Sequence, residues 1–269
     1  MIGKITVGQY YNADSPIHRL DPRIKLLSVF AFITLLFVAN SFAGYLFAAA
    51  CLFTVIFVSK VPFRLMFRGL RTLIFILAFT AALNIFFTPG ETVIFQFWII
   101  KMTLEGILFA SKMCFRLILL IIGSSVLTLT TSPIQLTDAI EYILKPFRKI
   151  GVPSHEIAMM MTIALRFIPI LSEELDKIMK AQIARGADFD TGGIIRRAKN
   201  LIPLLVPLFI SAIRRADELA TAMEARCYRG GGGRTKLKVM RLARRDGMAV
   251  CLIFLFASGI ITIKITGLV

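Results

Sequence analysis

Catalytic signatures are what this sequence most plainly lacks. It has two histidines, His18 and His155, and neither belongs to a nucleophile motif. The four cysteines show no metal-ligand or disulfide spacing, and three of them lie within apolar runs. The four-glycine run before Arg234 lacks the Gly-Lys-Ser/Thr ending of a nucleotide-binding loop. We therefore expect neither an enzyme nor a bound metal or cofactor.

Acidic residues are also scarce. The 269 residues include 16 Asp and Glu against 32 Lys and Arg, which gives a net charge of +16, yet 57% of the residues are hydrophobic. A soluble domain of this size could not bury so much apolar surface. A nucleic-acid-binding protein would explain the charge but not the apolar runs. Both facts favour an integral membrane protein with a basic aqueous portion.

Charge is absent altogether from Leu26 to Ser59. As one helix this run would be about 50 Å long, far beyond a hydrocarbon core of about 30 Å. Residues 40–44 interrupt it, so we expect a hairpin of two spans. Further spans are expected at residues 72–88, 117–131 and 247–263, which makes about five.

The stretch 92–109 is apolar and aromatic but is divided by Lys101 and Glu105. We expect it to form an interfacial or re-entrant segment on the outer side, with Lys112 and Arg116 snorkelling near the outer surface. Basic residues gather at the ends of the spans that would face the cytoplasm. The positive-inside rule then places the N-terminus in the cytoplasm and the C-terminus outside.

The predicted fold is an all-α integral membrane protein with about five transmembrane helices plus long cytoplasmic helices. We divide it into an N-terminal membrane region (1–131), a cytoplasmic or interfacial region (132–246) and a C-terminal transmembrane helix (247–269). The middle region holds most of the charged residues, and its pattern predicts helices over 133–149, 154–186 and 194–228. Its apolar stretches 157–171 and 201–213 are expected to rest on the spans or dip into the membrane.

A duplicated motif stands out in this middle region. Ala184-Arg185-Gly186 and Ala225-Arg226-Cys227 each end an alanine-rich, helix-favouring run, 41 positions apart. A basic residue near a helix C-terminus is ordinary by itself. Two copies on similar helices favour recognition of a partner, since small neighbours permit close approach and a guanidinium offers a fork of five donors.

Two further motifs complete the pattern. The first is Ser15-Pro16-Ile17-His18-Arg19-Leu20-Asp21-Pro22-Arg23-Ile24-Lys25, where Asp21-Pro22 predicts a helix cap and first turn; from the residues alone it is a membrane-surface lead-in. The second is Ala164-Leu165-Arg166-Phe167-Ile168-Pro169. With the paired Ala-Arg-small motifs, these make the chain resemble, over nearly its whole length, the transmembrane component of energy-coupling factor (ECF) transporters, the EcfT/CbiQ family.

The resemblance implies a location in the cell membrane of a prokaryote, and partners that the residues do not name. These are two ABC-type ATPase subunits, docked on Ala184, Arg185, Gly186, Ala225, Arg226 and Cys227, and a membrane-embedded substrate-binding subunit for a vitamin or a transition-metal ion. It gives His18, Leu20, Asp21, Pro22, Lys25, Arg166 and Pro169 supporting roles. Cys227 departs from the glycine of the family motif. The alternatives are a stand-alone channel or secondary carrier, which predicts charges lining a path, and a membrane-bound enzyme, which predicts a catalytic cluster.

Overall fold

The computed structural model describes residues 10–89, 92–97, 100–189, 193–230 and 242–266. The chain divides into two compact units. One, here called the bundle unit, comprises residues 9–139 and 239–269. The other, the arm unit, comprises residues 1–8 and 140–238. Each is considered by itself.

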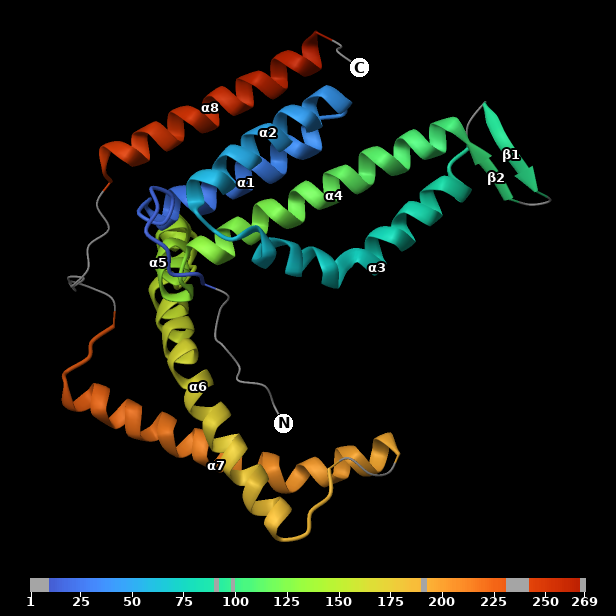
Figure 1. Ribbon diagram of the computed structural model, residues 1–269. Coiled ribbons are helices and arrows are strands. Elements are labelled where there is room, and N and C mark those ends of the chain that lie inside the picture. Colours follow the sequence, from blue (N-terminus) through green and yellow to red (C-terminus); the bar gives the residue numbers. More distant parts are fainter. Residues whose placement is uncertain (1–9, 90–91, 98–99, 190–192, 231–241, 267–269) are drawn as a thin grey trace. The chain divides into compact units, whose positions relative to one another are not determined.

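The bundle unit is a set of long helices lying side by side, with α3 and α4 joined by a two-stranded ribbon (Figure 1). Its elements are α1 (Pro22–Val38), α2 (Phe42–Ser59), α3 (Phe63–Phe87), β1 (Val93–Phe97), β2 (Ile100–Thr103), α4 (Leu104–Thr130) and α8 (Arg244–Ile265). Helix α5 (Pro133–Leu144) follows α4 and continues into the arm unit. The break between α1 and α2 lies at residues 39–41, close to the predicted interruption at 40–44, and α8 covers the predicted last span at 247–263.

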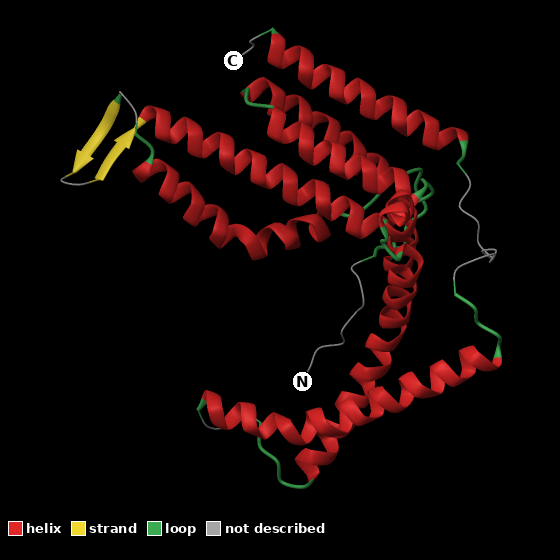
Figure 2. Ribbon diagram, turned by 180° about the vertical axis from the view of Figure 1, so that it is seen from behind, coloured by secondary structure: helices red, strands yellow, loops and turns green. Residues whose placement is uncertain are grey.

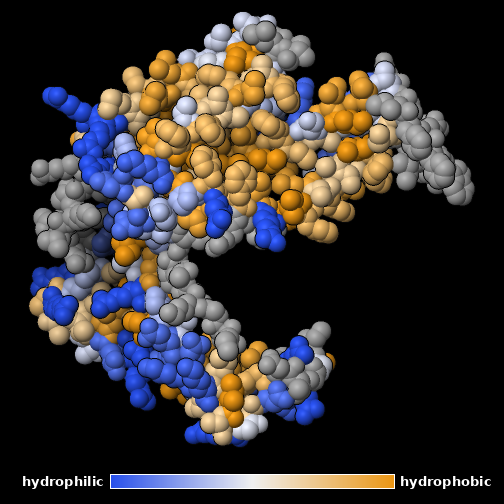
Figure 3. All heavy atoms as spheres, in the orientation of Figure 1, coloured by the Kyte–Doolittle hydropathy of each residue, from blue (hydrophilic) through white to orange (hydrophobic). Residues whose placement is uncertain are grey.

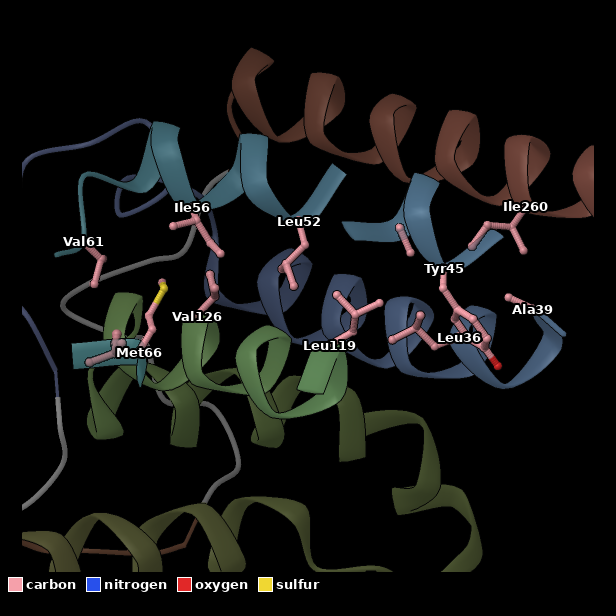
Figure 4. Packing of buried hydrophobic residues seen from close by; sticks show 12 residues of the cluster. Leu36, Ala39, Tyr45, Leu52, Ile56, Val61, Met66, Leu119, Val126 and Ile260 are labelled. Carbon is pink, nitrogen blue, oxygen red and sulfur yellow. The ribbon is translucent and has the colours of Figure 1, made fainter. Parts of the chain in front are cut away.

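The core of the bundle unit is a line of aliphatic side chains along α1, α2 and α4 (Figure 4). Leu36, Ala48 and Leu119 are buried in it, and Tyr45 and Ile260 are each 1% exposed. Two glycines let helices approach closely. A Cβ at Gly123 would lie 2.6 Å from the Phe32 ring, and one at Gly259 would lie 2.8 Å from Phe47. Small residues at such crossings favour helix packing in a membrane.

The outer surface of the bundle unit is strongly apolar (Figure 3). Its large side chains, such as Phe57, Phe75 and Phe254, are more than 70% exposed. By length and composition α2, α4, α6 and α8 could each cross a membrane, and α3 could be a fifth span, bent by 56° between Arg71 and Leu73. The all-α membrane fold class is therefore confirmed.

The stretch 92–109, predicted to be an interfacial or re-entrant segment, forms a two-stranded ribbon followed by the start of a helix, and its place relative to the membrane stays a prediction. Strands β1 and β2 form an antiparallel ribbon, with Phe97 paired to Ile100 and an irregularity between Val93 and Phe95. Helix α4 then begins at Leu104, with Thr103 as its N-cap accepting from the Gly106 amide. The sequence from Val93 to Thr103 is rich in β-branched and aromatic residues, which favour strands.

The predicted start of the fourth span at Leu117 is also wrong, because α4 contains both Lys112 and Arg116. Arg116 does not snorkel outward. Its Nε and Nη2 donate to the Tyr45 hydroxyl at 2.9 and 2.5 Å, and Nη2 donates to the Ala39 carbonyl at 3.3 Å. Its guanidinium also lies 5.4 Å from the Phe37 ring centroid. The physical reason is that the α1–α2 turn leaves carbonyls without helical partners, and a cation satisfies them.

The depth of this turn follows from a second contact. Lys25 Nζ donates to the Thr130 carbonyl at 2.9 Å, so the N-terminus of α1 lies level with the C-terminus of α4. Both Ala39 on α1 and Arg116 on α4 are 14 residues away from that level. This corresponds to about 21 Å along the helix axes, less than the roughly 30 Å of a hydrocarbon core.

Replacing Arg116 by methionine should lower the stability of the bundle unit. The Ala39 carbonyl and the Tyr45 hydroxyl would lose their shared donor, at a cost of about 2–3 kcal/mol. Thermal unfolding of the purified chain in detergent measures this as a lower Tm. Lys112→Met, one turn earlier on α4, is the control and should change Tm little. An unchanged Tm for Arg116→Met would contradict the assigned role.

The arm unit contains the end of α5, the 3₁₀ helix η1 (Lys145–Ile150), α6 (Ser154–Ala184) and α7 (Ile194–Ala225). Helices α6 and α7 cross each other (Figure 2). The predicted helix over 133–149 thus changes to a 3₁₀ helix at Lys145, where Pro146 follows. Gly151, at φ 93°, ends η1. The predicted breaks before α6 and α7 are confirmed.

Candidate functional site

The two Ala-Arg-small motifs form the C-terminal ends of α6 and α7, and the two ends have the same backbone geometry. Arg185 and Arg226 are the C-caps, with φ and ψ of −88° and 7°, and −91° and 15°. At the end of α6, the Gly186 amide donates to the Ile183 carbonyl at 2.9 Å, and the Ala187 amide donates to Gln182 at 3.0 Å. This paired bonding is a Schellman motif.

The end of α7 repeats the pattern bond for bond. The Cys227 amide donates to Glu224 at 2.8 Å and the Tyr228 amide donates to Met223 at 3.0 Å. All six motif residues at the two ends are exposed: Ala184, Arg185, Gly186, Ala225, Arg226 and Cys227. Each helix therefore presents one guanidinium from an equivalent cap position, next to the partially negative C-terminus of the helix dipole. The motif duplicated in the sequence therefore also has the same backbone conformation at both helix ends.

Cys227 is the one irregular member of the pair. It has a φ of 55° where the equivalent Gly186 has 84°. A side chain in this left-handed region crowds its own backbone, which a glycine avoids. The second helix end therefore keeps the motif geometry at some conformational cost.

Cys227→Gly should relieve that cost, which is about 1 kcal/mol for a non-glycine residue in the left-handed region. Amide hydrogen exchange of Tyr228 should slow, because its bond to Met223 opens less often. The matched control is Gly186→Ala, which should speed exchange at Ala187 at the other helix end. Faster exchange at Tyr228 in the glycine variant would contradict the strain argument.

The N-terminal motif, residues 15–25, folds into a set of hydrogen-bonded polar side chains in the bundle unit, here called the polar cluster. His18 Nε2 lies 3.0 Å from the Tyr11 carbonyl, which can only accept, so Nε2 carries the proton. His18 Nδ1 then accepts from the Ser15 hydroxyl at 2.7 Å. Burial lowers the pKa of the His18 imidazole from its ordinary value, which favours this neutral form. At the exposed surface of the polar cluster, a hydrogen bond from Arg19 lowers the pKa of Asp14.

Three further residues of the motif organise helix ends. Asp21 caps α1 by accepting from the Arg23 amide at 2.9 Å, and Pro22 occupies the first turn, so the predicted cap is confirmed. Lys25 is 5% exposed and donates to the carbonyls of His18 and Thr130. Leu20 is half-buried beside them.

Asp246 of α8, which the sequence analysis did not identify, also belongs to the polar cluster. It is 3% exposed; one oxygen accepts from the Asp21 amide at 2.9 Å and the other from the Ala243 amide at 2.7 Å. It thereby ties the start of α8 to the start of α1. An acidic residue directly before the predicted span 247–263 was the available signal, though it has many ordinary explanations.

Asp246→Asn should separate these two helix ends. The amide nitrogen would face a backbone N–H that needs an acceptor, and the mismatch should cost about 1–3 kcal/mol. The loss is measured as a lower Tm of the full chain in detergent. Asp217→Asn, on the exposed surface of α7, removes the same charge and should leave Tm unchanged. Equal effects of the two substitutions would show that charge, not the hydrogen bonds, matters.

Arg166 and Pro169 do not belong to the polar cluster; they lie on α6. Both are exposed, and Pro169 interrupts the helical hydrogen bonding within α6. The structure therefore brings His18, Asp21 and Lys25 together in one cluster, and it places Arg166 and Pro169 in the same helix as Arg185. Among the described residues no group of three His, Cys, Asp or Glu could hold a metal ion.

Comparison with known proteins gives the family. The model of the CbiQ family, described as cobalt transport protein, matches residues 13–237. The chain belongs to this family. It is 56% identical to the energy-coupling factor transporter transmembrane protein EcfT of Clostridium kluyveri, over 97% of this chain and 98% of the relative. The proteins of the same name from Thermosediminibacter oceani and Listeria innocua are 55% and 46% identical, over 95% and 90% of this chain and 96% and 91% of theirs.

Membership of the CbiQ family settles the general role. The chain is the transmembrane component of an ECF transporter, a bacterial membrane protein, and a non-catalytic subunit rather than an enzyme. The resemblance drawn from the sequence motifs is thus confirmed. It extends over nearly the whole chain, and the matched range includes both Ala-Arg-small motifs.

Proposed function

We propose that this chain transmits movement from two ABC-type ATPase subunits to a membrane-embedded substrate-binding subunit that imports a vitamin or a transition-metal ion. The observation that carries the proposal is the pair of geometrically equivalent, exposed arginine caps on α6 and α7. The two ATPase subunits would each meet the same shape. A guanidinium at a helix tip suits a groove lined with carbonyls or carboxylates.

The composition of the chain supports two separate roles. Residues 132–246, most of which belong to the arm unit, act as the coupling region, and residues 1–131 and 247–269, most of which belong to the bundle unit, act as the membrane region. The apolar, phenylalanine-rich surface of the bundle unit suits contact with lipid and with the substrate-binding subunit. The excess of basic residues in the coupling region puts it, together with the N-terminus, in the cytoplasm, where ATP is available.

A stand-alone channel or carrier is the less favoured alternative. It calls for ionisable groups lining a path through the spans. Arg116 on α4 is such a group by position, but its donors are directed to Tyr45 and Ala39 at the α1–α2 turn. It therefore serves the fold. A path for ions or substrate is not needed to explain it.

Charge reversal at the caps tests the docking role. Arg185→Glu or Arg226→Glu should weaken binding of the ATPases by about 2–5 kcal/mol at the altered end, since each buries a charge without its partner. Co-purification of the ATPases with the chain in detergent measures the loss, and the double variant should retain neither. Arg196→Glu, exposed at the start of α7, is the control and should retain both. Full retention and full transport by the double variant would overturn the proposal.

A further inference from the structure

The carboxylate of Glu174 on α6 forms hydrogen bonds to α7 where the two helices cross. Glu174 Oε1 accepts from the Ser211 hydroxyl at 2.5 Å, and Oε2 accepts from Arg215 Nη2 and Nε at 2.9 and 3.3 Å. Both oxygens of the α6 residue are therefore bonded to α7. Of the two charged side chains, Glu174 is 24% and Arg215 39% exposed, so the contact is partly shielded from solvent.

The position of this contact in the duplicated unit is informative. Glu174 and Arg215 are 41 residues apart, the same separation as Arg185 and Arg226. They are therefore equivalent positions in the two copies. Where two like helices cross about a local twofold axis, equivalent residues meet, and identical charges there would repel. Here one copy has Glu173-Glu174 and the other has Arg214-Arg215, so the charge is reversed and the crossing attracts.

Equal arms extend from the contact. Arg185 lies 11 residues beyond Glu174 on α6, and Arg226 lies 11 residues beyond Arg215 on α7. Each arm is about 16 Å long. Neither arm contains proline or glycine, whereas Pro169 in α6 and Pro203 and Pro207 in α7 all precede the contact. The helices are thus interrupted before the crossing and continuous beyond it.

We infer that Glu174, Ser211 and Arg215 form the pivot about which the two arginine-tipped arms turn. This inference rests on the proposed function. A carboxylate that accepts from a hydroxyl and a guanidinium keeps its bonds through modest rotation, because its sp² oxygens accept hydrogen bonds over a broad range of directions. With arms of about 16 Å, each 10° of rotation at the pivot moves a tip by roughly 3 Å. The three residues are positioning residues, since they act through Arg185 and Arg226.

Charge reversal with rescue tests the pivot in the full chain. Glu174→Arg and Arg215→Glu each place like charges at the crossing, and the double swap restores opposite charges. Spin labels at positions 180 and 221 report the arm separation; both sites are exposed, equivalent in the two copies and on a different helix face from the arginines. The native cysteines Cys51, Cys114, Cys227 and Cys251 are replaced by serine in every sample.

In lipid nanodiscs, the label–label distance distribution should broaden roughly twofold in each single variant and return to its native width in the double swap. The matched control is the neighbouring pair Glu173 and Arg214, which is equivalent in the repeat and exposed. Reversing either of these charges should leave the width unchanged. Native width in both pivot variants, or broadening by the control pair to the same extent, would overturn the inference.

A second measurement separates the pivot from docking. With the two ATPases bound, trapping with ATP and vanadate should shift the mean distance between the labels in the native chain, and in the double swap. The single variants should still retain the ATPases, because Arg185 and Arg226 are intact, but should lose that shift. Failure of the native chain to bind ATPases would refute the proposed function. Normal binding with a normal shift in both single variants would refute the pivot.

Discussion

Helix ends surrounded by apolar residues must have their backbone groups satisfied from within the protein, and this constraint explains where the bundle unit keeps its charges. Lipid offers no hydrogen bonds, so each free N–H or C=O costs several kcal/mol. Arg116 serves the end of α1, Lys25 serves the end of α4, and Asp246 serves the start of α1. Each of these three charged side chains bonds to the backbone where a helix starts or ends.

The same constraint explains why the N-terminal motif contains buried polar residues. His18, Asp21 and Lys25 are polar residues in a segment that precedes an apolar helix, and a solvated lead-in would place them in water. The structure instead buries Asp21 and Lys25 and joins them to the ends of α4 and α8. The polar cluster therefore joins the start of α1, the end of α4 and the start of α8 through side-chain-to-backbone hydrogen bonds, and it fixes these three helices relative to one another.

The arm unit follows the opposite rule. Its described charged residues lie mostly at the surface, and a partly exposed ion pair joins its two long helices. An exposed pair contributes little to stability, typically below about 1 kcal/mol. Such a junction suits parts that must change their relative orientation, whereas the packed core of α1, α2 and α4 suits parts that must keep theirs.

Much of this protein follows from sequence alone. The charge-free runs, the break at residues 40–44 and the prolines and glycines between helices determined the membrane class, the α1–α2 hairpin and the extents of α6 and α7, because local chemistry dictates where a helix starts and stops. The 41-residue duplication likewise predicted two equivalent helix ends around Arg185 and Arg226. What only the tertiary structure decided were contacts between distant residues: Arg116 with Tyr45, Asp21 with Asp246, and Glu174 with Arg215. A side chain's local sequence sets its charge, but the atoms that neutralise that charge are brought to it by the packing of other helices.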